Sequence, residues 1–375
     1  MNNKNNFDSD YCHLLEDILN NGFSKNTRAG EVISVFGRQI RINMRDGKFP
    51  LLTTKKMFYK GIIHELLWFI SGNTNIKYLL DNNVHIWDDD AYRYYLEQSK
   101  CQKEQFNKDD FLNYVQDNGE FLLNTQDKPD ILKYYKAGDL GPVYGHQWRK
   151  QGSKKIDQLQ NAITMLKSNP DDRRIIVNAW NAEDIPDMAL PPCHIMFQFY
   201  TRPLSLKERC NLIPAYTNEL IWQHENIDFD NLTESKIEEI QNSLSLFNIP
   251  ERELSLMWTQ RSVDAFLGLP FNCSSYALLL AMVAQCVNMT TGDVIGSLGD
   301  THIYKQHLPA VKEQLSNDCY KYNLPVLRLN PQIKNIDDFK YQDIEILNYN
   351  SFNTIKAPLL TGLKQTTSNN ATQKR

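Results

Sequence analysis

The chain has 375 residues, of which 41% are hydrophobic and 23% charged, and its formal net charge is -4. This composition is that of an ordinary globular protein, long enough for one large domain or two medium ones. The small negative charge gives no electrostatic reason to expect binding to nucleic acid or to a membrane. An anionic ligand would therefore have to be met by local arginines or lysines.

The cysteines and the N-terminus limit where the protein works. The seven cysteines are scattered, odd in number and without CxxC spacing, which argues against a disulfide framework and against a structural zinc site. The N-terminal stretch MNNKNNFDSDYCHLL lacks the apolar core of a signal peptide, and we find no uncharged apolar run suited to a membrane span. We therefore expect a cytoplasmic protein without a bound metal.

The first elements expected are a helix over Tyr11–Asn21 and a strand over Val32–Met44. Arg28 lies in the loop between them, where a guanidinium could grip a phosphate, although a plain surface arginine is the simpler interpretation. A long apolar helix is expected over Phe58–Ile70. Glu65 within it is costly to bury unless it is paired or used. A buried carboxylic acid with a raised pKa is a common proton donor, but a surface glutamate is an equally good interpretation.

The regular pattern is interrupted twice, by residues 89–136 and 201–251. Both stretches are interpreted as insertions, the first partly helical and the second with a helix over Thr233–Ser243. Neither carries a motif that predicts chemistry. We expect one domain over residues 1–364, followed by a tail, 365–375, whose polar composition predicts disorder.

The stretch DDRRIIVNAWNAEDIPDMALPPCHIMFQFY, residues 171–200, is the most informative part of the chain. It opens with Arg173 and Arg174 before an apolar run, and it closes with two prolines, Cys193 and an alternating pattern typical of a strand. A rigid entrance to a strand is a good mounting for a nucleophile. Taken alone, however, a single cysteine in apolar surroundings is more often inert, and adjacent arginines are usually solvated.

The C-terminal half predicts a strand over Glu253–Asp264, a turn over Gly268–Asn272 and a buried apolar helix over Ser274–Val287. Another strand is expected to end at Gly299–Tyr304. The last ordered piece is expected over Ile344–Leu360.

Several motifs occur together and in one order: IIHELLWF, RRIIVNAWN, MALPPCHIMFQFY, QRSVDAFLGLPFN, SYALLLAMVAQ and GDTHIY. Together they strongly resemble the thymidylate synthases that use folate and a cysteine nucleophile, over essentially Tyr11–Leu360. The resemblance implies a single α/β (α+β) domain with a mixed sheet and helices on one face, whose other face stacks on its mate in a homodimer. It also implies the methylation of dUMP to dTMP with 5,10-methylenetetrahydrofolate, which supplies both carbon and hydride and leaves as dihydrofolate.

The resemblance also assigns roles to single residues. The nucleophile that adds to C6 of the pyrimidine would be Cys193, with its thiolate favoured by Arg261. Glu65 and Tyr144 would move protons, and Asn272 would recognise uracil, since an acidic residue there would suit cytosine better. The full catalytic set implied is Cys193, Glu65, Tyr144, Asp264, Arg261 and His194. The substrate-binding set implied is Arg28, Arg173, Arg174, Gln260, Arg261, Ser262, Asp264, Asn272, His302 and Tyr304.

The folate side and the partner subunit complete this expectation. Arg173 and Arg174 resemble the pair that reaches into the neighbour's phosphate site, which would make the homodimer part of the catalytic unit. The cofactor-binding set implied is Lys55, Trp87, Asp264 and Gly268, with Trp87 as an aromatic partner of the pterin and Lys55 as the cation for the folate glutamate.

Two alternatives stay open, and the first rests on a departure from the family. In the family the chain ends just after the segment that matches Ala357–Leu360, and that end closes over the folate, whereas here residues 361–375 follow. A looser closure would admit water, and the product would then be 5-hydroxymethyl-dUMP with tetrahydrofolate. The first alternative is therefore a dUMP hydroxymethylase. The second is a nucleotide- or RNA-binding regulator without turnover, in which the insertions bind a partner.

Overall fold

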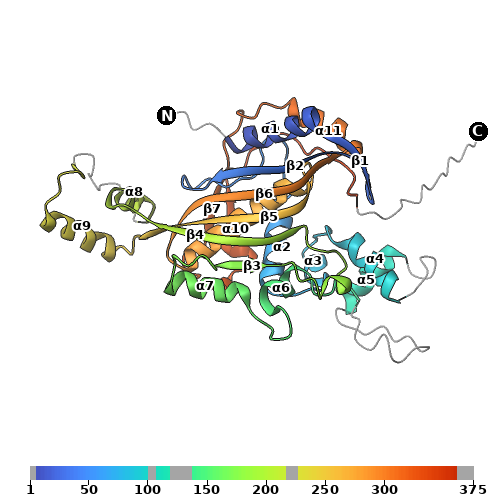
Figure 1. Ribbon diagram of the computed structural model, residues 1–375, viewed down its shortest axis with the longest axis horizontal. Helices are drawn as coiled ribbons and strands as arrows, with labels where there is room; N and C mark the ends of the chain where they lie inside the picture. Colours follow the sequence, from blue (N-terminus) through green and yellow to red (C-terminus); the bar gives the residue numbers. More distant parts are fainter. Residues whose placement is uncertain (1–5, 100–106, 119–136, 217–226, 361–375) are drawn as a thin grey trace, which may run out of the picture.

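The computed structural model describes residues 6–99, 107–118, 137–216 and 227–360 (Figure 1). Its centre is a six-stranded sheet with the order β1-β2-β6-β5-β4-β3, in which only β5 and β6 pair in parallel. The mixed sheet implied by the resemblance is confirmed. The strands are β1 (Phe23–Thr27), β2 (Gly30–Asn43), β3 (Ile176–Asn178), β4 (His194–Pro203), β5 (Arg252–Asp264) and β6 (Thr290–Tyr304), and a separate pair is formed by β7 (Val326–Leu329) and β8 (Ile344–Leu347).

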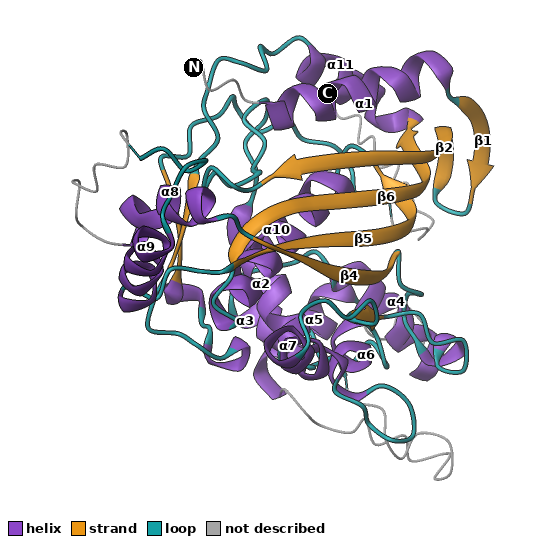
Figure 2. Cartoon of the chain, turned by 60° about the vertical axis from the view of Figure 1, so that its left-hand side comes forward, coloured by secondary structure: helices purple, strands orange, loops and turns teal. Residues whose placement is uncertain are grey.

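The described helices cover one side of the sheet and its ends (Figure 2). The long helix α10 packs on β5 and β6, α2 packs on α10, and α1 packs on β2. The helices are α1 (Asn6–Asn21), α2 (Tyr59–Ile70), α3 (Lys77–Asp81), α4 (Asp88–Ser99), α5 (Lys108–Asn118), α6 (Tyr144–Lys150), α7 (Gln158–Ser168), α8 (Leu206–Tyr216), α9 (Glu234–Leu246), α10 (Gly268–Cys286) and α11 (Leu308–Leu315). The helices expected near the N-terminus, in the apolar stretch before Ile70 and in the second irregular segment are therefore confirmed.

One prediction of secondary structure is wrong. Gly268–Asn272 is not a turn but the beginning of α10. The side chain of Asp264 accepts the backbone N–H groups of Phe266 and Leu267 at 3.0 and 3.1 Å, which satisfies donors just ahead of the helix. Pro270 lies in the first turn of the helix, where a missing N–H costs nothing. A Gly and a Pro that look like turn residues in the sequence therefore mark a helix start.

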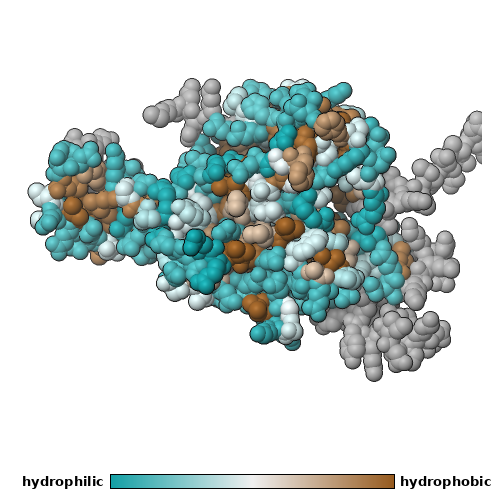
Figure 3. Space-filling view, in the orientation of Figure 1, coloured by the Kyte–Doolittle hydropathy of each residue, from teal (hydrophilic) through white to brown (hydrophobic). Residues whose placement is uncertain are grey.

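The two faces of the sheet differ in character. A cross-strand row of Ile40, Gly296, Trp258, Phe197 and Val177 lies on the helix-covered face and is buried, with Gly296 leaving room for the Trp258 indole. The neighbouring row on the other face consists of Arg41, Ile295, Met257, Gln198 and Ile176, of which Arg41, Met257 and Ile176 are exposed in the single chain. Figure 3 shows hydrophobic side chains gathered over the middle of the molecule in this view.

The two irregular segments are both partly helical, but they attach differently. The described part of residues 89–136 forms most of α4 and α5, which bury Tyr92, Tyr95 and Phe111 in the main core. The described part of residues 201–251 forms α8 and α9, which hold a separate small core and project from the sheet (Figure 1). Residues 100–106, 119–136 and 217–226, and the tail predicted to be disordered, lie outside the described residues.

Helix α10 is long and apolar enough to cross a membrane by length and composition alone. However, 78% of its most apolar 18-residue stretch is buried inside the structure, so it is a core helix rather than a membrane span.

Candidate active site

The backbone of Cys193 is fixed from two sides, immediately before β4. Its N–H donates to the hydroxyl oxygen of Tyr144 at 2.7 Å, and its carbonyl accepts the N–H of Arg261 at 2.8 Å. The Arg261 guanidinium donates to the carbonyls of Pro192 and Pro191 at 2.8 and 2.9 Å. The strand entrance predicted from the two prolines is therefore held rigidly by α6 and β5.

The thiol of Cys193 is less activated than the sequence suggested. Burial raises the pKa of this thiol above its ordinary value, and the carboxylate of Asp90 raises it further. The guanidinium groups of Arg261 and, to a smaller extent, Arg28 lower it. The guanidinium therefore favours the thiolate, as expected, but it does not outweigh burial. In the single chain, the pKa of the thiol therefore stays above its ordinary value.

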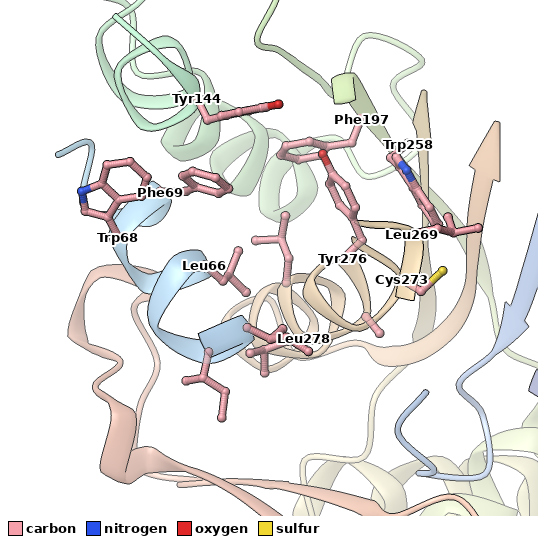
Figure 4. Close-up of a cluster of buried hydrophobic side chains, with 14 of the residues drawn as sticks. Leu66, Trp68, Phe69, Tyr144, Phe197, Trp258, Leu269, Cys273, Tyr276 and Leu278 are labelled. Atoms are coloured by element: carbon pink, nitrogen blue, oxygen red, sulfur yellow. The ribbon is translucent and has the colours of Figure 1, made fainter. Parts of the chain in front are cut away.

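Buried aromatic side chains gather in the core, among them Tyr144 on α6 and Tyr276 on α10 (Figure 4), and His194 contacts both. The Nδ1 of His194 lies 2.7 Å from the hydroxyl of Tyr276 on α10, and the His194 ring stacks on Tyr144 with centroids 4.2 Å apart. Burial lowers the pKa of His194 to about 3, so the imidazole is neutral at physiological pH. His194 therefore shapes the pocket as a neutral ring and does not act as a cation beside the thiol.

Glu65 is a strong candidate for the proton donor. Burial raises its pKa to about 7, and the indole N–H of Trp87, which donates to Oε1 at 2.8 Å, partly opposes that rise. The carboxyl group is therefore divided between its two protonation states near neutral pH, as proton transfer requires. Trp87 itself packs against Phe69 and Tyr144, which places it at the same side of the site.

The amide of Asn272 is oriented by Gln260. Gln260 Nε2 donates to Asn272 Oδ1 at 3.1 Å and to the carbonyl of Ser262 at 3.0 Å, while its own oxygen accepts the Trp258 indole N–H at 3.1 Å. This chain of donors assigns the oxygen of Asn272 toward Gln260, so that its NH2 group is the end left to donate. Gly268 lies beside this amide, since a Cβ there would be 3.9 Å from Asn272 Oδ1.

His302 and Tyr304 lie two residues apart on β6, on an extended segment as expected. The Nδ1 of His302 lies 3.1 Å from the carbonyl of Asp300, and its ring meets that of Tyr304 edge to face at 5.2 Å. Burial raises the pKa of Tyr304 to about 12, with the charges of Asp264 and Cys193 adding to the effect. Tyr304 is therefore a neutral hydroxyl close to the nucleophile.

The three predicted phosphate arginines outside β5 are placed differently. Arg28 lies in the two-residue turn between β1 and β2, and its positive charge is close enough to lower the pKa of both Cys193 and Tyr304. Arg173 and Arg174 lie just before β3 and are exposed. The carbonyl of Arg173 accepts from Gln198, five residues along β4 from Cys193, or about 16 Å at the usual rise of a strand. The structure therefore brings Arg28 to this chain's nucleophile but not Arg173 and Arg174.

Lys55 is turned away from solvent in this structure. Its ammonium group donates to the carbonyl of Phe266 at 2.6 Å and lies over the Phe266 ring, and burial lowers its pKa to about 7. It lies beneath the segment that follows Asp264, so it supports the floor of the site. A role in meeting a folate carboxylate stays a prediction.

Sequence reasoning missed the contribution of α4. Arg93 donates to the carbonyl of Ala189 at 2.5 Å and pairs with Asp90 at 2.8 Å, and the hydroxyl of Tyr94 donates to the carbonyl of Asp187 at 2.8 Å. These bonds hold the loop that leads into the two prolines before Cys193. No motif in the sequence of α4 points to this role, because the contacts are to backbone carbonyls far along the chain.

The comparisons with known proteins identify the family of the chain. A family model described as thymidylate synthase matches residues 9–213 and 220–361. The thymidylate synthase of Mycoplasma mobile is 45% identical over 351 residues, which cover 92% of this chain and 98% of that protein. The chain belongs to the thymidylate synthase family. The thymidylate synthase of Malacoplasma penetrans, 40% identical over 348 residues, covers the same shares of the two chains.

Family membership confirms the resemblance and decides the class of reaction. The chain is a methyltransferase of dTMP biosynthesis that makes dTMP from dUMP. Both matches favour this activity over the two alternatives, the hydroxymethylase and the regulator without turnover, because both relatives are thymidylate synthases and align along nearly their whole length.

Proposed function

We propose that Cys193 adds to C6 of dUMP and that 5,10-methylenetetrahydrofolate then supplies the methyl carbon and the hydride, leaving as dihydrofolate. The observation that carries the proposal is that three groups lie around one strand entrance: Cys193 with its fixed backbone, Glu65 with its raised pKa, and the oriented amide of Asn272. A thiol is suited to the task because its thiolate is a soft nucleophile and a good later leaving group.

Addition of sulfur to C6 moves negative charge to O4 of the pyrimidine. The NH2 group of Asn272 can donate to that oxygen, and Glu65 can supply a proton to it from its protonated form. A cytosine would present an amino group at this position, and two NH2 groups would then face each other. The arrangement of Gln260 and Asn272 therefore supports uracil as the base.

Tyr144 is proposed to help remove the proton from C5. Burial raises its pKa well above the ordinary value of 10, so it cannot act as a free tyrosinate. Its oxygen already accepts the N–H of Cys193, which leaves its own proton free to donate. Tyr144 therefore serves as one member of a proton relay, and Glu65 is the group in reach whose pKa suits the final acceptor.

The phosphate of dUMP is proposed to lie between Arg28, Arg261 and Ser262, with Arg173 and Arg174 supplied by a second copy of the chain. Arg261 is exposed and uses only part of its guanidinium on the proline carbonyls, so donors remain for an anion. The open sheet face, with its exposed Met257 and Ile176, supports stacking of two copies in a homodimer.

A mixing experiment tests the shared site. The Cys193→Ser chain and the chain carrying Arg173→Ala and Arg174→Ala should each be nearly inactive alone. After subunit exchange, about a quarter of the sites would combine an intact cysteine with an intact arginine pair, and activity should return to about that level. Mixed dimers without recovered activity would contradict the shared site.

On the folate side, Trp87, Asp264 and Gly268 are proposed to contact the pterin, and no metal is proposed. Lys55 would have to turn outward from Phe266 to meet the folate glutamate, which makes it the member of this set that needs a rearrangement. The scattered cysteines and the soluble fold support a cytoplasmic location.

The proposal is tested by turnover of dUMP with 5,10-methylenetetrahydrofolate by the purified chain. The expected result is dTMP from the wild type and none from Cys193→Ala, with dUMP binding by calorimetry retained in the variant. A Cys193→Ala chain that still makes dTMP would show that another residue is the nucleophile.

A further inference from the structure

Two cysteines outside the active site lie against each other. The sulfurs of Cys12 and Cys319 are 3.2 Å apart, although the residues are 307 positions apart in the chain. Cys12 lies on α1, and Cys319 lies in the turn region that follows α11. The side chains already point at each other, so a bond between them needs little movement of the backbone.

The same two segments grip one short stretch of chain. From α1, the buried carboxylate of Asp8 accepts the N–H groups of Thr53 and Thr54 at 3.0 and 2.9 Å. From the other side, Gln314 donates to the hydroxyl of Thr54 at 2.9 Å and Asn317 to its carbonyl at 2.9 Å. Cys12 and Cys319 therefore lie on the two segments that hold Thr53 and Thr54 in place, and the next residue in the chain is Lys55, beneath the active site.

The two thiols differ in exposure and in acidity, as a redox pair requires. Cys12 is buried, whereas Cys319 is partly exposed, so an oxidant from solvent meets Cys319 first. The hydrogen bond with Cys12 also lowers the pKa of Cys319, which favours the reactive thiolate there.

We propose that Cys12 and Cys319 form a reversible disulfide when the protein meets a peroxide. The thiolate of Cys319 attacks one peroxide oxygen, the O–O bond breaks, and a sulfenic acid and hydroxide result. The sulfur of Cys12 then attacks the sulfenic sulfur, the S–S bond forms, the S–O bond breaks, and the proton of Cys12 leaves with the oxygen as water. In sum, two thiols and one hydrogen peroxide give one disulfide and two waters, and a small dithiol reverses the reaction.

The disulfide would join the N-terminal helix to the C-terminal third of the chain. Closing so long a loop restricts the unfolded chain, which should stabilise the folded protein. Neither cysteine belongs to the proposed catalytic or binding sets, so activity with reduced Cys193 should be preserved.

The test uses the full chain treated with dilute hydrogen peroxide while dUMP is present. Peptide mapping without reduction should find the peptides of Cys12 and Cys319 linked, with a loss of two hydrogen masses, and dithiothreitol should restore them. The thermal midpoint should rise by several degrees in the oxidised protein. Cys319→Ser should abolish both effects without changing basal turnover, whereas Cys286→Ser, which removes another buried cysteine, should retain them.

Two results would overturn the proposal. One is oxidation of Cys319 to sulfinic acid without a link to Cys12. The other is a link that forms in Cys319→Ser, which would show that a different pair is responsible. Cys12→Ala provides a second variant, since it removes the partner sulfur and leaves Cys319 free to be oxidised alone.

Discussion

Residues 89–136 and 201–251 look alike in the sequence, because both are polar and neither carries a recognisable motif. In the structure they differ. Helix α4 lies in the main core and donates hydrogen bonds to the loop before Cys193, whereas α8 and α9 pack around Ile240 and Leu244 in a core of their own (Figure 1).

The difference follows from where each segment joins the fold. Residues 89–136 follow Trp87, which contacts Glu65, so their first helix starts at the site. Residues 201–251 join the end of β4 to the start of β5, and these two strands place Cys193 and Arg261 at their opposite end. The polar composition of these two segments thus does not predict whether they contribute to the site, whereas the position at which each joins the fold does.

The largest effect is expected at the site end, from Glu65→Gln. The amide is of similar shape but cannot give up a proton, so kcat should fall by about 10²–10⁴-fold. The same substitution should also change how the folding stability depends on pH. Because burial raises the pKa of Glu65 from 4.5 to about 7, the wild type loses stability as pH rises through that interval, and the variant should not. Steady-state kinetics and melting curves at pH 5 and 8 check both expectations.

The next effect is expected from Arg93→Ala in α4. Loss of the bond to Ala189 frees the loop before Cys193, and misplacement of a reacting group by a fraction of an ångström should lower kcat by about 10-fold or more. The KM for dUMP should change less than kcat. Arg93→Lys should recover part of the rate, and an unchanged kcat in Arg93→Ala would mean that α4 only fills the core.

A smaller effect is expected from Trp87→Phe. The indole N–H lowers the pKa of Glu65, so its removal should raise that pKa above about 7. The loss of kcat on the alkaline side should then move to higher pH by up to about one unit. A profile that does not move would show that Glu65 is not the group that limits the reaction there.

The smallest effect is expected when residues 205–250 are replaced by a short polar turn. The core around Leu244 is separate from the main core, so kcat and KM should stay within about twofold of the wild type. Leu244→Ala is the matched point change. It should destabilise α8 and α9 by about 2–5 kcal/mol while turnover continues. A large loss of activity in either variant would contradict the conclusion that, unlike residues 89–136, residues 201–251 do not support the active site.

Local patterns in the sequence predicted much of this molecule. The prolines before Cys193 and the alternating residues after it predict the strand entrance. For Glu65 in an apolar helix, the sequence left a buried carboxylic acid with a raised pKa and a surface glutamate as equal interpretations, and the structure favours the first. The prediction failed at Gly268–Asn272, because these turn-like residues begin a helix whose preceding segment is held by the carboxylate of Asp264.

Other features depend on contacts between distant parts of the chain. Arg93 acts on the backbone of Ala189, and Cys12 meets Cys319 from the other end of the molecule. The sequence around one member of each pair does not indicate which distant residue it contacts. The low pKa of His194 likewise results from burial, which only the assembled core creates.

The most direct test of the proposed chemistry is to identify both products of one turnover reaction by mass. The full chain is incubated with dUMP and 5,10-methylenetetrahydrofolate, beside a chain that ends after Leu360. We predict dTMP and dihydrofolate from the full chain. Formation of 5-hydroxymethyl-dUMP and tetrahydrofolate by the full chain would contradict the account, and it would show that water reaches the intermediate before the hydride does.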